Sequence, residues 1–107
     1  MATSVDFIEY VREQVKGPWE IRYRKMFGEY MVYVNEKPVL LVCDNTVYVK
    51  KFERLAQLMP GAETGFPYPG AKEHYLLDIE DTELCREVVA FLEQVTPYPK
   101  PKKKQGV

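Results

Sequence analysis

The residues in this chain that could carry out chemistry are few, and the first of them is a single histidine. His74 is the only histidine, so a nucleophilic site with a histidine base could be built around no other residue. No nucleophile motif such as G-x-S-x-G accompanies it. The pattern favours a histidine at the surface or at the end of a strand over a catalytic base.

Two cysteines are the next candidates. Cys43 and Cys85 lie 42 positions apart, with no C-x-x-C motif and no neighbouring histidine. This spacing favours two small core residues over metal ligands, redox partners or nucleophiles.

A group of carboxylates could in principle provide acid–base chemistry or hold a hard cation. The group consists of Asp78, Glu80, Asp81 and Glu83. An EF-hand pattern is absent, and acidic residues at the start of a helix are stabilised by the helix dipole alone. The glycines form neither of the common nucleotide-binding loops. We therefore predict a protein that is not an enzyme and has no catalytic residue, metal or cofactor.

Length and composition indicate one small domain with its own core. With 107 residues, 46% of them hydrophobic, the chain can bury on the order of two-thirds of its unfolded surface. The N-terminus lacks the basic start and unbroken apolar stretch of a signal peptide, and no window approaches a membrane span. We expect a cytoplasmic protein with a domain over residues 1–96 and a disordered Pro/Lys-rich tail over residues 97–107.

Charge is divided unevenly between the domain and the tail. Four of the 15 basic residues are in the tail, which leaves residues 1–99 with 11 basic against 16 acidic side chains, a net charge of −5. A domain with this net negative charge is not expected to bind duplex DNA by itself, because contacts to the phosphates supply most of the non-specific affinity. The tail could still make a weak nucleic-acid contact through Lys100, Lys102, Lys103 and Lys104.

The hydrophobic patterns predict that helices precede and follow a sheet along the chain. The expected helices run from a cap at Thr3 or Ser4 to about Lys16, over residues 52–59, and from a cap at Asp81 or Thr82 along a stripe of Leu84, Val88, Phe91, Leu92 and Val95. The expected strands cover residues 19–25, 30–34, 39–43, 46–50 and 74–79, with a loop over 60–70.

Two of these strands are apolar on both faces. Residues 30–34 and the run Val39 to Cys43 carry hydrophobic side chains without alternation, which is typical of a strand that is covered on both sides. We therefore expect either a helix or a second subunit over the second face. In strand 46–50, by contrast, Val47 and Val49 should point inward, and Tyr48 and Lys50 outward.

Residues 22–50 and the segment FPYPG at 66–70 resemble the TfoX/Sxy N-terminal domain family in order and spacing. The likeness covers roughly residues 20–95. Glu29 stands at the family's second glycine, and Asn35-Glu36 at its Asp-Gly turn, so we expect a longer loop at that hairpin. The family motif maps onto Arg24, Lys25, Met26, Phe27, Gly28, Tyr33, Tyr48 and Lys50.

The resemblance implies an α+β fold with an antiparallel meander of about four to five strands flanked by N-terminal and C-terminal helices, similar to secretion chaperones. It also implies a bacterial, non-enzymatic regulatory module linked to competence. Its partner would be the transcription machinery or a transcription regulator. Two alternatives stay open, a small-ligand-binding domain and a chaperone-like homodimer.

A partner surface can be proposed from the exposed basic and aromatic residues. These residues are Arg22, Arg24, Lys50, Lys51, Phe66 and Tyr68. Interleaved charge and aromatic rings also occur in single-strand nucleic-acid binders. Glu20, Glu29 and Glu53 dilute the positive charge, so a mixed solvated face is the competing interpretation.

Overall fold

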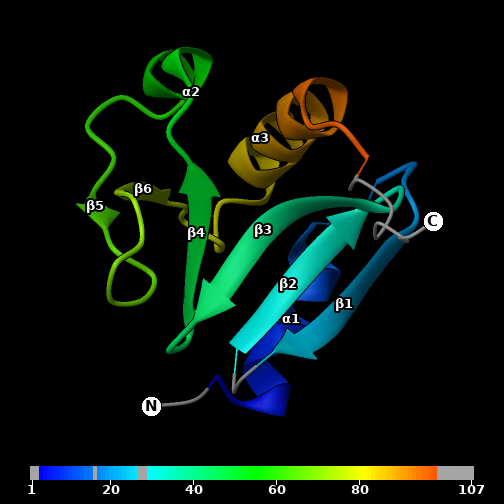
Figure 1. Cartoon of the computed structure of the whole chain (residues 1–107). Helices are drawn as coiled ribbons and strands as arrows, with labels where there is room; N and C mark the ends of the chain where they lie inside the picture. The colour runs from blue at the N-terminus through cyan, green and yellow to red at the C-terminus, as the bar shows by residue number, and fades with distance from the viewer. Residues whose placement is uncertain (1–2, 16, 27–28, 99–107) are drawn as a thin grey trace, which may run out of the picture.

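The computed structural model describes residues 3–15, 17–26 and 29–98, which form an α+β domain (Figure 1). This confirms the predicted fold class. The elements in chain order are α1 (Val5–Gln14), β1 (Ile21–Met26), β2 (Glu29–Val34), β3 (Lys37–Cys43), β4 (Thr46–Lys50), α2 (Glu53–Leu58), β5 (Thr64–Gly65), β6 (His74–Leu76) and α3 (Thr82–Val95).

In the described part of the chain, six antiparallel strands form one sheet in the order β1-β2-β3-β4-β6-β5. The first four strands are the predicted meander. Strand β5 lies inside residues 60–70, where the sequence predicted only a loop. Thr64 pairs with Tyr75 and Gly65 pairs with His74. A two-residue strand is too short for any alternation of polar and apolar residues to reveal it.

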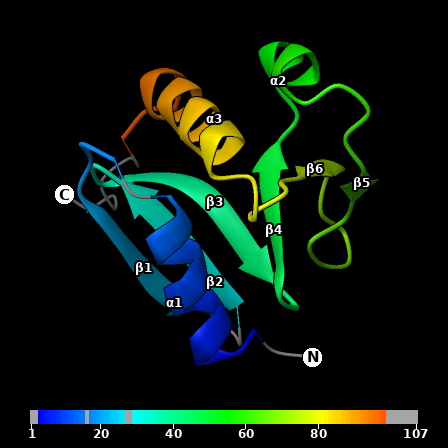
Figure 2. The same ribbon diagram turned by 180° about the vertical axis from the view of Figure 1, so that it is seen from behind.

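Helices α1 and α3 lie on one face of the sheet, as Figure 2 shows. Ile8 and Val11 of α1, Val32 of β2, Leu40 of β3 and Leu92 of α3 are 0 to 1% exposed and belong to one core cluster. Burial of this layer supplies most of the driving force for folding, at roughly 25 cal/mol per Å² of apolar surface.

The helices begin and end within one or two residues of the predicted positions. Ser4 caps α1 by accepting a hydrogen bond from the Phe7 amide, and Asp81 caps α3 by accepting one from the Leu84 amide. The stripe predicted for α3 needs one correction. Val95, the last residue of the helix, is 43% exposed. The buried residues of α3 are Val88 and Leu92 of the predicted stripe, together with Cys85 and Val89.

The turn between β2 and β3 is a tight two-residue turn, so the longer loop expected there was wrong. Asn35 and Glu36 have φ values of 51° and 70°. A left-handed glutamate is unfavourable by itself. Arg22 on the neighbouring strand holds this side chain, since its Nε and Nη2 donate hydrogen bonds of 3.0 and 2.7 Å to the Glu36 carboxylate.

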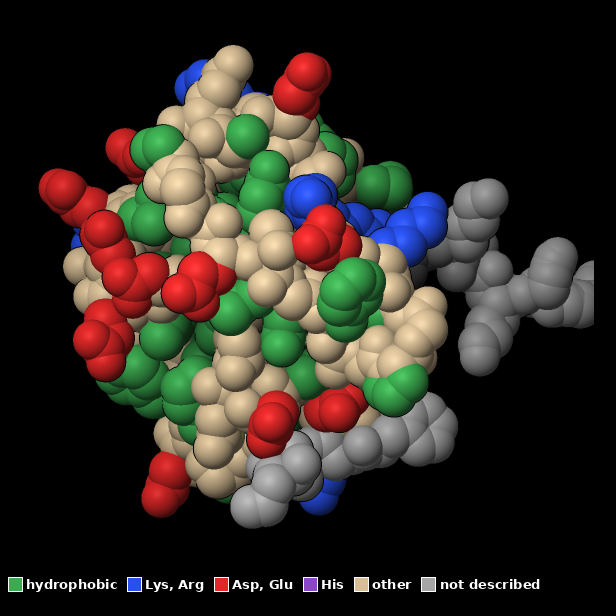
Figure 3. All heavy atoms as spheres, turned by 90° about the vertical axis from the view of Figure 1, so that its left-hand side faces the viewer, with side chains coloured by type: hydrophobic (Ala, Val, Ile, Leu, Met, Phe, Trp, Pro, Cys, Tyr) green, Lys and Arg blue, Asp and Glu red, His purple; other side chains and the backbone are tan. Residues whose placement is uncertain are grey.

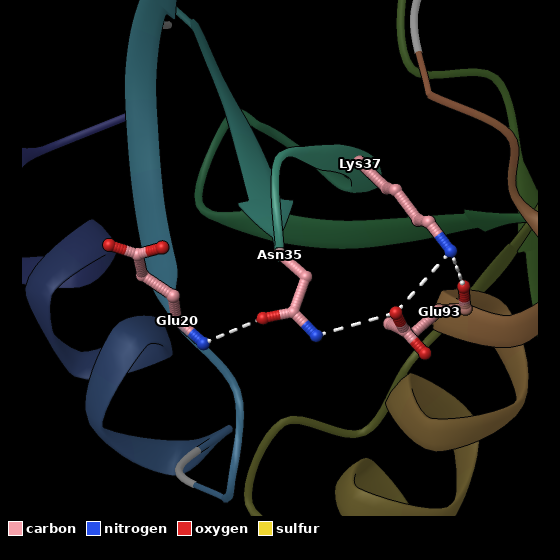
Figure 4. Close-up of polar contacts among 4 residues, drawn as sticks. All are labelled: Glu20, Asn35, Lys37 and Glu93. Atoms are coloured by element: carbon pink, nitrogen blue, oxygen red, sulfur yellow. Dashed lines mark hydrogen bonds and ion pairs between the residues drawn. The ribbon is translucent and has the colours of Figure 1, made fainter.

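A polar network ties the same turn to the end of α3 (Figure 4). Asn35 Oδ1 accepts a hydrogen bond from the Glu20 amide at 3.0 Å, and Asn35 Nδ2 donates to the Glu93 carboxylate at 3.3 Å. Lys37 Nζ donates to the Glu93 carbonyl at 2.8 Å. That carbonyl is in the last turn of α3, where the helix offers it no amide partner. Lys37 therefore caps the helix and places a cation at its negative end.

Neighbouring leucines of β3 should respond differently to truncation. Leu40 is fully buried against the helices, whereas Leu41 points to the other face and is half-buried. We expect Leu40→Ala to lower the free energy of unfolding by about 3 kcal/mol and Leu41→Ala by about 1 kcal/mol or less. Urea denaturation measures both. Equal losses would contradict the assignment of the two faces.

The β2–β3 turn provides a second stability prediction. Glu36→Gly removes the left-handed penalty together with the Arg22 pair, and an exposed pair contributes little. We expect the melting temperature to stay constant or to rise by a few degrees. Glu36→Ala is the matched control, because it loses the pair and keeps the strain, so it should melt at a lower temperature. A melting temperature of Glu36→Gly below that of Glu36→Ala would contradict the turn geometry.

Candidate functional site

The sheet face opposite α1 and α3 carries a row of apolar side chains. Cross-strand pairing aligns Met31 of β2, Leu41 of β3, Tyr48 of β4 and Leu76 of β6, and Arg24 of β1 stands at the end of this row. The four apolar members are half-buried. We call this the open face, because none of the helices in the described residues lies on it (Figures 1 and 2).

The sequence predicted either a helix or a second subunit over the second face of residues 30–34 and 39–43. Among the described helices, α1 and α3 cover the side of Val32 and Leu40, and none covers the other side. Cover by a second subunit stays a prediction. Met31 and Leu41 on the other side keep contact with solvent. A surface of this kind is a candidate for binding another molecule.

A groove interrupts the open face where β3 and β4 separate. Their ladder contains three pairs, from Leu41↔Tyr48 to Cys43↔Thr46, and β4 then continues beside β6. A shift of register in β3 leaves Val39 as an extra residue. Figure 1 shows the two strands diverging toward α2 and α3. The resulting cavity is about 420 Å³ in volume.

The floor of the groove is apolar and its rim is basic. Leu40 and Leu92 are the most buried of its lining residues, and Phe52 packs edge-to-face on Phe91, with ring centroids 5.7 Å apart. No carboxylate lines the groove among the residues that the structure describes. The basic side chains that line it are Lys50, Lys72 and His74.

The connection between β5 and β6 forms one wall of the groove. Tyr68, Gly70 and Ala71 line it, and the Ala71 amide donates to the Tyr68 carbonyl at 3.0 Å. Gly70 has a φ of 85°, a conformation that side chains disfavour. His74 Nδ1 donates to the Lys72 carbonyl at 2.7 Å. These bonds fix the wall, and the Lys72 side chain is exposed.

The structure brings only part of the predicted partner surface together. Lys50 and Tyr68 both line the groove. Arg22 and Arg24 are on β1, three strands from β4, which corresponds to roughly 14 Å. Lys51 is held by Glu73 at 2.9 Å. The six residues therefore do not form one continuous patch.

The remaining predicted residues have different settings. Phe66 is 61% exposed beside β5 and does not line the groove. Tyr33 lies under the Arg22 guanidinium, with 4.6 Å from its carbon to the ring centroid. Lys25 and Met26 are exposed on β1. Phe27, Gly28 and the four tail lysines Lys100, Lys102, Lys103 and Lys104 lie outside the described residues.

Met31, Leu41 and Leu76 were not predicted as site residues, because they are ordinary apolar side chains without charge or an aromatic ring. For Met31 and Leu41 the available signal was the lack of alternation in residues 30–34 and 39–43, which predicts a covered strand as readily as a binding surface.

The carboxylate group predicted from the sequence does not line the groove. Glu63, Asp78, Glu80 and Asp81 line a second cavity of about 750 Å³. Figure 3 shows several acidic side chains gathered on the left of that view. Asp78 accepts a hydrogen bond from the Glu80 amide at 3.2 Å. Together with the cap made by Asp81, this bond agrees with the structural role predicted for the group. Within the described residues no cluster of three or more potential metal ligands occurs.

Both thiols are buried and unpaired, as predicted. Burial, with a smaller effect of the Glu29 carboxylate, raises the pKa of Cys43 to about 12. Burial, with a smaller effect of Asp81 and Asp78, likewise raises the pKa of Cys85 to about 12. A thiol must ionise to act as a nucleophile, so neither is activated.

These observations define a small α+β protein whose antiparallel sheet is covered by helices on one face. The chain is 33% identical over 105 residues to the "Uncharacterized 12.7 kDa protein in trpE 5'region" of Spirochaeta aurantia, a match that spans 96% of this chain and 91% of that protein. The chain belongs to the same family as that protein.

No family model matches the chain, and no solved structure matches it. The TfoX/Sxy resemblance therefore stays a prediction. None of the helices in the described ranges has the length and apolar character needed to cross a membrane.

The two cysteines should resist alkylation in the folded protein. With a pKa of about 12, only about one thiol in ten thousand is ionised at pH 8. We expect iodoacetamide to modify neither cysteine over an hour at pH 8 and both in 6 M guanidinium, as measured by intact mass. Rapid labelling of Cys43 in the native protein would contradict its buried environment.

Proposed function

We propose that this protein is a non-enzymatic protein-binding module that engages its partner through the open face. The observation that supports this is the row of Met31, Leu41, Tyr48 and Leu76, which crosses four adjacent strands on the side away from the helices. Rigid strands hold these side chains in place before binding, so ordering them costs little conformational entropy.

The composition of the open face suits recognition of a protein. Its apolar row is bordered by polar and charged groups, with Arg24 at one end and Lys50 beside Tyr48. An apolar centre inside a polar rim is the usual anatomy of a protein interface. Aromatic and methionine side chains, here Tyr48 and Met31, are enriched at such centres.

A regulatory role follows from the TfoX/Sxy resemblance as part of this proposal. The partner would then be a component of the transcription machinery or a transcription regulator, and the tail lysines would add a weak nucleic-acid contact. A cytoplasmic location belongs to the same proposal. Two unpaired, buried thiols support it, because reduced cysteines are the rule in that compartment.

Capture from a lysate of the source organism tests the proposal. We expect the immobilised full chain to retain a specific protein after nuclease treatment, and Leu41→Glu or Met31→Glu to reduce its recovery by about tenfold or more, because each places a charge in the interface centre. Mass spectrometry identifies and quantifies the retained protein.

Val5→Glu is the matched control, since Val5 is 61% exposed on α1. It should leave recovery unchanged, and thermal melts should show that all variants are folded. If the folded Leu41→Glu and Met31→Glu variants capture the same protein as the unmodified chain, the open face is not the binding surface.

A further inference from the structure

From the groove between β3 and β4 we infer the chemistry of the partner. We propose that the groove takes an extended peptide segment that carries acidic side chains next to a large apolar one. This inference rests on the proposed function, because the groove is part of the open face.

The apolar component follows from the lining of the groove. Leu40, Phe52 and Leu92 form its floor, and Met31 and Leu41 belong to its sides. Its volume of about 420 Å³ lies in the range of sites that enclose most of a small ligand. A buried apolar anchor is also the feature that contributes most to peptide affinity.

The acidic component follows from the charge around the groove. Lys50 and Lys72 are exposed at its rim, and His74 lies opposite Lys50 in the ladder between β4 and β6. Neither lysine forms an ion pair with another described residue, whereas nearby Lys51 is held by Glu73. A carboxylate arriving at the rim therefore meets two lysines that form no ion pair within the described part of the chain.

The extended conformation follows from the separation of the strands. The β3–β4 ladder stops at Leu41↔Tyr48, so Pro38 to Leu40 and Val49 to Lys50 form no ladder with each other. Backbone groups along a strand can bind an extended main chain, with side-chain pockets supplying specificity. The groove lies directly beside these segments.

A nucleic-acid strand fits these observations less well than a peptide. Single-strand binding needs aromatic faces that are free for bases to stack upon. The Tyr48 ring meets His74 edge-on at 6.4 Å, and Phe52 is engaged by Phe91. Among the described lining residues this leaves the 49% exposed Tyr68 as a single stacking position, whereas single-strand binders stack successive bases. The rest of the floor consists of Leu40 and Leu92, whose aliphatic side chains accommodate a leucine-like side chain better than a base.

Fluorescence anisotropy with defined probes tests this inference on the full chain. The probe is a ten-residue fluorescein-labelled peptide of alternating Glu and Leu, compared with Lys–Leu and Glu–Ser peptides of equal length, a ten-nucleotide oligo(dT), and decanoate as a competitor. We expect the Glu–Leu peptide alone to bind measurably. Amide shifts in ¹⁵N spectra should centre on Leu41, Tyr48, Lys50 and Lys72.

Charge reversal at the rim provides the decisive variant. Lys50→Glu with Lys72→Glu should weaken binding of the Glu–Leu peptide by about tenfold or more. Arg12→Glu with Arg86→Glu is the control, because it changes the net charge equally at exposed positions on α1 and α3. The control should retain affinity within about twofold of the unmodified chain, since surface charges away from a site contribute little.

Several outcomes would overturn the inference. These are binding of Lys–Leu or Glu–Ser peptides as tight as that of Glu–Leu, binding of oligo(dT) alone, complete displacement by decanoate, or no binding of any probe. Lysate capture that is lost in Leu41→Glu but kept in the Lys50/Lys72 double variant would refute the acidic segment and leave the open face as the interface. Capture unaffected by either change would refute both proposals.

Discussion

The apolar layer between the sheet and helices α1 and α3 is the interaction on which the rest of this structure depends. Ile8, Val11, Leu40 and Leu92 meet there without exposure to solvent. Both long helices, α1 and α3, lie on that face of the sheet, as Figure 2 shows. Consequently no helix of the described ranges lies over the opposite face of the sheet.

The position of α3 also explains the groove. Lys37 and Asn35 hold the end of α3 at the β2–β3 turn, while Phe91 of α3 packs on Phe52 after β4. The helix therefore contacts the sheet on both sides of the point where β3 and β4 separate. Leu92 reaches the floor of the opening from behind, so the groove is closed at its base rather than passing through the sheet.

Local sequence signals were sufficient for most of the fold. Alternation correctly placed Val47 and Val49 inside and Tyr48 outside, and the cap residues Ser4 and Asp81 marked the helix starts. The tight turn at Glu36 was missed, because its left-handed conformation is stabilised by Arg22, 14 positions earlier. Strand β5 was missed because it has only two residues and is defined by its pairing with β6.

The candidate site was less predictable than the fold. Lys50 and Tyr68 could be selected as exposed residues of the right types, and both line the groove. Their proximity depends on the β5–β6 connection, which no local pattern specifies. Leu41 is indistinguishable in type from its neighbour Leu40, and only cross-strand register assigns the two to opposite faces.

Accessibility of the open face in the free protein is the central claim and can be measured directly. Methyl signals of Met31, Leu41 and Leu76 would be recorded by NMR in the presence of a soluble gadolinium chelate, with Leu40 and Leu92 as buried references. If the open face is accessible, the first three signals broaden strongly and the reference signals change little. Protection of Leu41 equal to that of Leu40 would show that the face is already covered, and would contradict the account.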